Sequence, residues 1–185
     1  MYGRSPQAEE ALFMHGYSLY LQSPNYKLDQ TSTLDAINAM QNFINLYPRS
    51  EYKERATLVL DELQHKLAKK AYDNAKLYYN VSRYKAALIV LENFSEDFPD
   101  SEYNEEVAFL RIQAAYELAK NSLPRLQQER YNDVMDIYLS FIDRYPESAW
   151  GREAERLYVN SQAELARMKN TTPSPATTST ENNNQ

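Results

Sequence analysis

The stretch Phe98-Pro-Asp-Ser-Glu-Tyr103 decides the fold, because it recurs as Tyr47-Pro-Arg-Ser-Glu-Tyr52 and as Tyr145-Pro-Glu-Ser-Ala-Trp150. Counting back from each proline, related residues stand 12, 8 and 5 positions earlier: Ala36, Met40, Phe43; Ala87, Leu91, Phe94; and Val134, Tyr138, Phe141. Steps of four and three residues place these side chains on one face of a helix. Each copy therefore predicts a helix that its proline ends, followed by a serine that is expected to cap the next helix.

This repeat predicts pairs of antiparallel helices of the tetratricopeptide type, whose signature includes small residues inside the pair and a closing proline. With Pro99 as the closing proline, Ala75 and Ala87 occupy the two small positions. The middle unit, about 68–101, is then close to the standard length of about 34 residues. Small side chains at these positions let the two helices of a pair approach closely.

The outer units hold extra residues between their two helices, at 22–33 and at 121–130. Pro24 and Pro124 lie in these inserts, so both inserts are expected to be loops. Residues 51–79 contain neither glycine nor proline and repeat their apolar residues at helical spacing. They are therefore expected to form one long helix that bridges the first two repeats.

The predicted fold class is all-α, a tetratricopeptide-repeat-like superhelix of about seven helices with one long bridging helix. The last residues are almost entirely Thr, Ser, Pro, Asn and Gln, a composition that cannot bury enough apolar surface to order itself. The expected organisation is a flexible start at 1–5, a repeat domain at 6–169 with repeats at about 6–50, 51–101 and 102–148 and a capping helix at 149–169, and a disordered tail at 170–185.

Composition excludes several function classes for these 185 residues. No cysteine is present, which excludes a disulfide framework, a thiolate zinc site and a cysteine nucleophile. The three glycines stand far apart and leave no phosphate-binding loop. The net charge of −6 opposes nucleic-acid binding. No apolar run reaches the membrane-spanning length of about 18 residues, and no signal peptide is visible; a cytoplasmic start and a segment cut from a longer precursor both fit.

Glu62 and His65 form the one motif with metal-ligand spacing, an E-x-x-H on the predicted long helix. A di-metal helical bundle needs a second such motif and two further glutamates. His15 has Leu12 in the place where the second glutamate would stand. We therefore expect no metal site, no cofactor and no catalytic residue, and interpret the chain as a protein that is not an enzyme.

Charge is distributed unevenly along the chain. Residues 63–85 contain six basic residues and one acidic residue, whereas residues 86–110 contain seven acidic residues and no basic one. Two interpretations stay open: solvated faces whose charges offset each other, or a docking surface that steers a partner. Tyrosines at inserts and hairpin corners, among them Tyr20, suit protein interfaces. The partner-binding candidates are Tyr26, Asp29, Tyr79, Arg83, Tyr84 and Tyr131.

The chain resembles the BamD family of outer-membrane assembly lipoproteins over about residues 8–169. The resemblance is carried by Ala11-Leu-Phe-Met-His-Gly-Tyr17, by Ser23-Pro-Asn-Tyr-Lys-Leu-Asp-Gln-Thr31, and by the aromatic-Pro-x-Ser ending of 36–52. Residues 67–72 and the doubled tyrosine at 78–79 on the long helix fit as well. In this resemblance the chain corresponds to the C-terminal repeats of the family, and the two N-terminal repeats are absent.

The resemblance implies a scaffold subunit of the β-barrel assembly machinery on the periplasmic face of the outer membrane. Its implied partners are the barrel-forming component, held through its periplasmic domains, other assembly lipoproteins, and unfolded barrel substrates. Substrate contact belongs to the missing N-terminal repeats, and membrane attachment to a lipidated cysteine that this chain lacks. The alternatives are another tetratricopeptide adaptor of the bacterial envelope and a cytoplasmic peptide-binding module.

Overall fold

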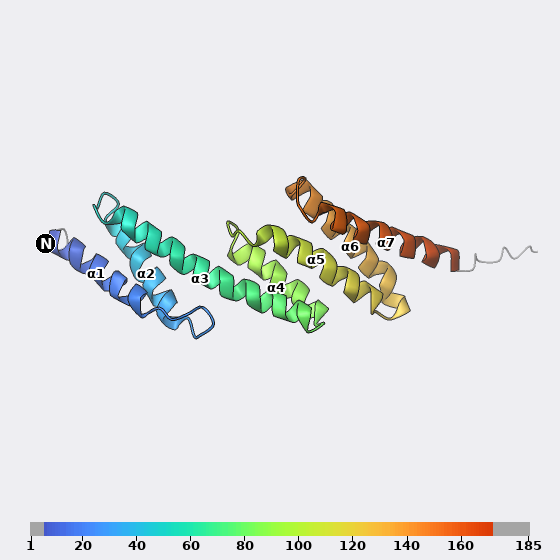
Figure 1. The fold of residues 1–185 in the computed structure, drawn as a ribbon, viewed down its shortest axis with the longest axis horizontal. Helices are drawn as coiled ribbons and strands as arrows, with labels where there is room; N and C mark the ends of the chain where they lie inside the picture. Colours follow the sequence, from blue (N-terminus) through green and yellow to red (C-terminus); the bar gives the residue numbers. More distant parts are fainter. Residues whose placement is uncertain (1–5, 172–185) are drawn as a thin grey trace, which may run out of the picture. The chain divides into compact units, whose positions relative to one another are not determined.

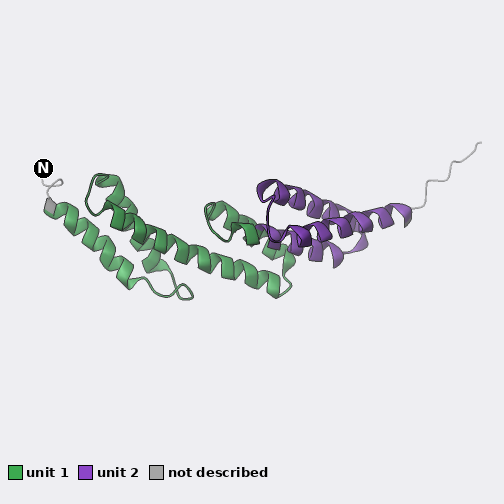
Figure 2. Cartoon of the chain, turned by 45° about the horizontal axis from the view of Figure 1, so that its top comes forward, with its two compact units in different colours: residues 1–107 green, residues 108–185 purple. Residues whose placement is uncertain are grey.

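The computed structural model describes residues 6–171, and the secondary-structure elements of that range are all α-helices. Its described part contains seven helices: α1 Pro6–Gln22, α2 Thr31–Leu46, α3 Lys53–Asn80, α4 Tyr84–Asp97, α5 Asn104–Lys120, α6 Pro124–Arg144 and α7 Gly151–Thr171 (Figure 1). The chain divides into two compact units, residues 1–107 and 108–185, with the boundary inside α5 (Figure 2). The all-α fold of tetratricopeptide-like helical repeats is confirmed.

Helix α3 is the predicted bridging helix, and it is a single uninterrupted helix of 28 residues. In its first half it contacts α1 and α2 of the first helical pair, and it also contacts α4. Its buried residues recur at helical spacing along its whole length: Ala56, Val59, Leu60, Leu63, Ala68, Tyr72 and Ala75. The long apolar stripe therefore belongs to one helix that is shared by two helical pairs, as Figure 1 shows.

The residues aligned across the three repeats form the core. All three residues that stand twelve positions before a proline, Ala36, Ala87 and Val134, are fully buried. The small residues at the facing positions of the repeat pattern, Gly16, Ala75 and Ala115, are buried as well. A Cβ added at Gly16 would lie only 3.2 Å from Sδ of Met40. The remaining members of the aligned face are buried too, except the half-buried Tyr138. The predicted close approach of paired helices is confirmed at these positions.

The three proline corners share one hydrogen-bond pattern. At each, Oγ of the serine accepts a hydrogen bond from the amide two residues later, at 3.0 Å for Ser50, 3.3 Å for Ser101 and 3.1 Å for Ser148. That amide lies one residue before the next helix begins, so the serine forms a serine turn outside the helix. The expectation that these serines are N-caps is therefore wrong by position, although each accepts from a backbone amide at the corner.

The aromatic residues on both sides of each serine make the same kind of ring contact in all three repeats. The ring before each proline packs on the phenylalanine four residues earlier, in the pairs Phe43–Tyr47, Phe94–Phe98 and Phe141–Tyr145. The ring after each serine stacks on an aromatic residue of the preceding odd-numbered helix, in the pairs Phe13–Tyr52, Tyr72–Tyr103 and Phe109–Trp150. The recurrence of aromatics along the chain is thus explained by packing.

The two inserts differ in structure. Residues 23–30 form a loop between α1 and α2, as expected. The prediction that the second insert is a loop is wrong, because α6 begins at Pro124 and most of 121–130 is helical. Proline is well tolerated at the first position of a helix, where its missing amide hydrogen has no partner to lose and its φ is already helical. Pro124 therefore starts a helix instead of interrupting one.

Candidate functional site

The loop of residues 23–30 carries Asp29 and is folded by side chains that bond to their own backbone. Oδ1 of Asn25 accepts a hydrogen bond from the amide of Lys27 at 3.0 Å. Oδ1 of Asp29 accepts from the amide of Thr31 at 3.0 Å, just where α2 starts. Hydrogen bonds from Thr31 lower the pKa of Asp29, so this exposed carboxylate is fixed in place and charged.

Lysines of α3 hold this loop against the helix. Nζ of Lys66 donates to Oγ of Ser23 at 2.7 Å, and Nζ of Lys70 donates to the carbonyl oxygen of Leu28 at 2.5 Å. The buried side chain of Gln30 also donates to the Leu28 carbonyl, at 3.0 Å. Part of the basic stretch, for which a docking surface was one of two open interpretations, therefore bonds inside the molecule and holds the loop in one conformation.

Tyr26 belongs to a cluster in which one ammonium group lies near three tyrosine rings. Nζ of Lys69 is 5.9 Å from the ring centroid of Tyr26, 5.0 Å from that of Tyr72 and 5.5 Å from that of Tyr103. The same nitrogen donates to Oδ1 of Asp73 at 2.6 Å. Cation–π attraction joins the loop, α3 and the corner before α5, and the ion pair with Asp73, also on α3, holds the ammonium group in place.

Lys76 and Glu106 form an ion pair at 2.8 Å beside the same cluster, and Nζ of Lys76 also donates to the hydroxyl oxygen of Tyr72 at 2.9 Å. The hydrogen bond to Glu106 is the main reason that the pKa of Lys76 is raised. Partial burial alone would raise the pKa of Glu106, but the hydrogen bonds from Lys76 and Tyr72 outweigh it and lower that pKa. The pair is thus charged across the neutral range.

Replacing Glu106 by glutamine is expected to lower the free energy of unfolding at pH 7 by about 0.5–1 kcal/mol, because the pair is partly exposed. A lowered folded-state pKa stabilises the fold above the unfolded value of about 4.5 and loses that effect as pH falls through the folded value. The difference between Glu106→Gln and the unmodified chain should therefore shrink below that pH in urea titrations. Glu105→Gln is the matched control, and an equal, pH-independent loss in both variants would contradict the ion-pair account.

The turn between α3 and α4 brings three predicted residues together. The ring centroids of Tyr79 and Tyr84 lie 5.8 Å apart, and the exposed Arg83 stands between them in sequence. Ser82 has a positive φ of 58°, and the amides of Ser82 and Arg83 bond to the carbonyl oxygens of Tyr79 and Tyr78. This bond pattern ends a helix in a fixed backbone geometry, so the turn holds its two rings beside each other and exposes Arg83 between them.

The expectation that Tyr131 lies at an exposed corner and binds a partner there is wrong. It stands inside α6 with 3% of its surface exposed, and its ring packs edge-on against Tyr116 at 6.0 Å. The cause is the helical conformation of 124–130, which turns the tyrosine into the core of its unit. Burial also raises its pKa. Tyr131 is therefore a packing residue of the second unit.

Glu62 of the E-x-x-H motif has a structural partner on another helix. The hydroxyl of Tyr20 donates to Oε2 of Glu62 at 2.5 Å, a bond that raises the pKa of Tyr20 and joins α1 to α3. Within residues 6–171, no group of three histidine, aspartate or glutamate side chains is arranged to hold a metal ion. Glu62 is thus a structural partner of Tyr20.

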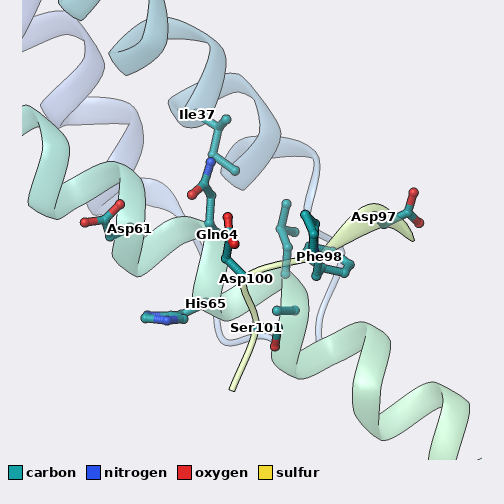
Figure 3. Close-up of a pocket in the computed structure, with 11 residues that line it drawn as sticks. Ile37, Asp61, Gln64, His65, Asp97, Phe98, Asp100 and Ser101 are labelled. Atoms are coloured by element: carbon teal, nitrogen blue, oxygen red, sulfur yellow. The ribbon is translucent and has the colours of Figure 1, made fainter. Parts of the chain in front are cut away.

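A pocket with a volume of about 540 Å³ opens in the first unit where α2, α3 and the end of α4 meet (Figure 3). Its apolar lining includes Ile37, Leu67 and Phe98, and its polar lining includes Asp61 and Asp100. The pocket follows from the length of α3, because α2 covers one part of that helix and α4 another. Sequence analysis missed this pocket, since residues 37, 61 and 98 come together only in the folded chain.

The structure thus defines a class of protein, an all-α helical-repeat protein of the tetratricopeptide-like type. No helix within residues 6–171 has the length and apolar character needed to cross a membrane. The family model described as an outer membrane lipoprotein, YfiO, matches residues 1–129 and again residues 69–173. The chain therefore belongs to the YfiO family of outer membrane lipoproteins.

A curated relative agrees with this family. The chain is 22% identical over 157 residues, 85% of its length, to a Caulobacter vibrioides protein named outer membrane protein assembly factor BamD. The chain spans about half of that relative, since the match covers 48% of it. The resemblance to the BamD family that the sequence indicates is confirmed by both comparisons.

Proposed function

We propose that this chain is a non-enzymatic scaffold subunit of the outer-membrane β-barrel assembly machinery. It docks on the periplasmic domains of the barrel-forming component, at the periplasmic face of the outer membrane, and helps outer-membrane proteins to insert. Other assembly lipoproteins and unfolded barrel substrates are further partners. The observation that carries the proposal is the family match, whose two segments together extend from residue 1 to residue 173.

The architecture supports a docking role because hydrogen bonds and stacked rings hold its exposed loop and corners in defined conformations. The corners, the loop and the helix pairs are closed by hydrogen bonds and stacked rings, so little conformational entropy is left to lose on binding. We propose two surfaces as the partner-binding regions. The first is the loop with Tyr26 and Asp29, and the second is the α3–α4 turn with Tyr79, Arg83 and Tyr84.

The test is a titration of the chain, by calorimetry, against the purified periplasmic domains of the barrel-forming component from the same organism. Arg83→Glu is expected to weaken binding by about tenfold or more, because it reverses the charge of an exposed residue at the proposed interface. The exposed Arg152 on α7 offers the control Arg152→Glu, which makes the same charge change elsewhere and should bind like the unmodified chain. Equal affinity of all three proteins would contradict the assignment of the turn, provided that their melting temperatures agree.

A further inference from the structure

The pocket between α2, α3 and the end of α4 combines an apolar floor with an acidic rim. Ile37 of α2, Leu67 and Ala68 of α3 and Phe98 after α4 supply apolar surface. Their exposed fractions differ: Ala68 is buried, whereas the other three are half-buried and so present part of their surface. A volume of about 540 Å³ exceeds the space of one amino-acid side chain, so the pocket can admit a side chain together with its neighbours.

Three exposed carboxylates stand on its rim. Figure 3 places Asp100 between Asp61 of α3 and Asp97 at the end of α4. No lysine or arginine is among the residues that line the pocket in the described part of the chain. Within residues 6–171, no ion pair or hydrogen bond neutralises any of the three side chains. The rim therefore carries three carboxylates without an ion-pair partner among the described residues, beside an apolar surface, and His65 is the other titratable residue of the lining.

The nearby lysines of α3 do not form ion pairs with the carboxylates of this rim. Lys66 and Lys70 bond to the 23–30 loop, Lys69 to Asp73, and Lys76 to Glu106. The basic stretch of the sequence thus forms ion pairs with only part of the acidic stretch. Asp97 and Asp100 of the acidic stretch stand at the pocket beside Asp61 of α3, where a partner's positive charge would find both opposite charge and apolar contact.

We propose that this pocket receives an arginine side chain from a segment of a partner protein. A guanidinium group is planar and weakly hydrated, and it presents several donors that suit carboxylates on more than one side. Its three-carbon stem can lie along apolar surface while its head reaches the acidic rim. The inference rests on the shape and charge of the pocket and not on the proposed function, so either can fail without the other.

Arginine fits this pocket better than two other cations. A lysine ammonium is compact and strongly hydrated, so it gains less from an apolar floor. A metal ion needs several ligands within about 2.0–2.6 Å, and no described group of three histidine or carboxylate side chains is arranged in that way. Of these three cations, arginine is the one whose stem matches the apolar surface and whose head matches the acidic rim.

The experiment uses the 185-residue chain and a heptapeptide, acetyl-Gly-Ser-Leu-Arg-Leu-Ser-Gly-amide, followed by two-dimensional NMR. Saturable shifts of the backbone amides of Ile37, Leu67, Phe98 and Ser101 are expected, with a dissociation constant of about 1 mM. The same peptide with citrulline, a neutral isostere of arginine, should give no saturable shift. A peptide with lysine should bind at least about threefold more weakly.

Two triple variants with the same change in charge decide the location. Asp61→Asn/Asp97→Asn/Asp100→Asn should weaken binding of the arginine peptide by about fivefold or more. The control Asp143→Asn/Glu147→Gln/Glu155→Gln removes three exposed acids of the second unit and should leave the affinity within about twofold. Equal weakening by both variants, equal binding of the citrulline peptide, or no saturable shift at about 10 mM peptide would each overturn the proposal.

Discussion

Phe43→Ala is expected to lower the free energy of unfolding by about 3–5 kcal/mol, the cost of removing a large aromatic side chain from a packed core. Phe43 is fully buried, and its ring lies 5.5 Å from the ring of Phe13 and 5.7 Å from that of Tyr47. It also belongs to the core cluster that joins α1, α2 and α3. Circular dichroism with urea measures the loss.

The same helix offers a control for this truncation. Leu46 of α2 is 59% exposed, so Leu46→Ala removes apolar atoms without opening a cavity and should change stability by less than about 0.5 kcal/mol. Hydrogen exchange should locate the loss of protection caused by Phe43→Ala in α1, α2 and the first part of α3. If Phe43→Ala melts at the same temperature as the unmodified chain, the role of Phe43 in the core of the first repeat is contradicted.

Ala87→Leu is expected to destabilise the chain by about 1–3 kcal/mol, through overpacking instead of a cavity. Ala87 of α4 has no exposed surface, and the small residue Ala75 of α3, its partner in the repeat pattern, is fully buried as well. A leucine there must push α4 away from α3 or adopt a strained rotamer. Thermal unfolding followed by calorimetry provides the measurement.

Ala163 provides the matched control, since Ala163→Leu adds the same atoms on an exposed position of α7. Its melting temperature should stay close to that of the unmodified chain, because both residues are good helix formers. If Ala87→Leu melts at the temperature of Ala163→Leu, the close contact of α3 and α4 at this position is contradicted.

The helical fold and its core face could be predicted because both depend on local sequence. The spacing of Ala87, Leu91 and Phe94 before a proline is a helix signal, and all three side chains are buried in the structure. The long helix could be predicted for the same reason. Pro124 shows the limit of this reasoning, since proline starts some helices and breaks others, and only the neighbouring residues decide between the two.

The candidate site was harder to predict, because surfaces arise from tertiary contacts. The corner with Tyr79, Arg83 and Tyr84 could be predicted, as the three residues are close in sequence. The use of α3 lysines to anchor the 23–30 loop could not, because the contact of Lys66 with Ser23 joins residues 43 positions apart. The stacking of Tyr103 on Tyr72 likewise depends on how α3 and the α4–α5 corner meet.

The most direct test of the proposed function is a measurement of mass. The 21.6 kDa chain is mixed with the periplasmic domains of the barrel-forming component from the same organism, at about 50 μM of each, and sedimentation velocity is recorded. The account predicts a new species with the summed mass of the two proteins, formed at the expense of both free components. Two separate species with unchanged sedimentation coefficients, from a chain shown to be folded, would contradict it.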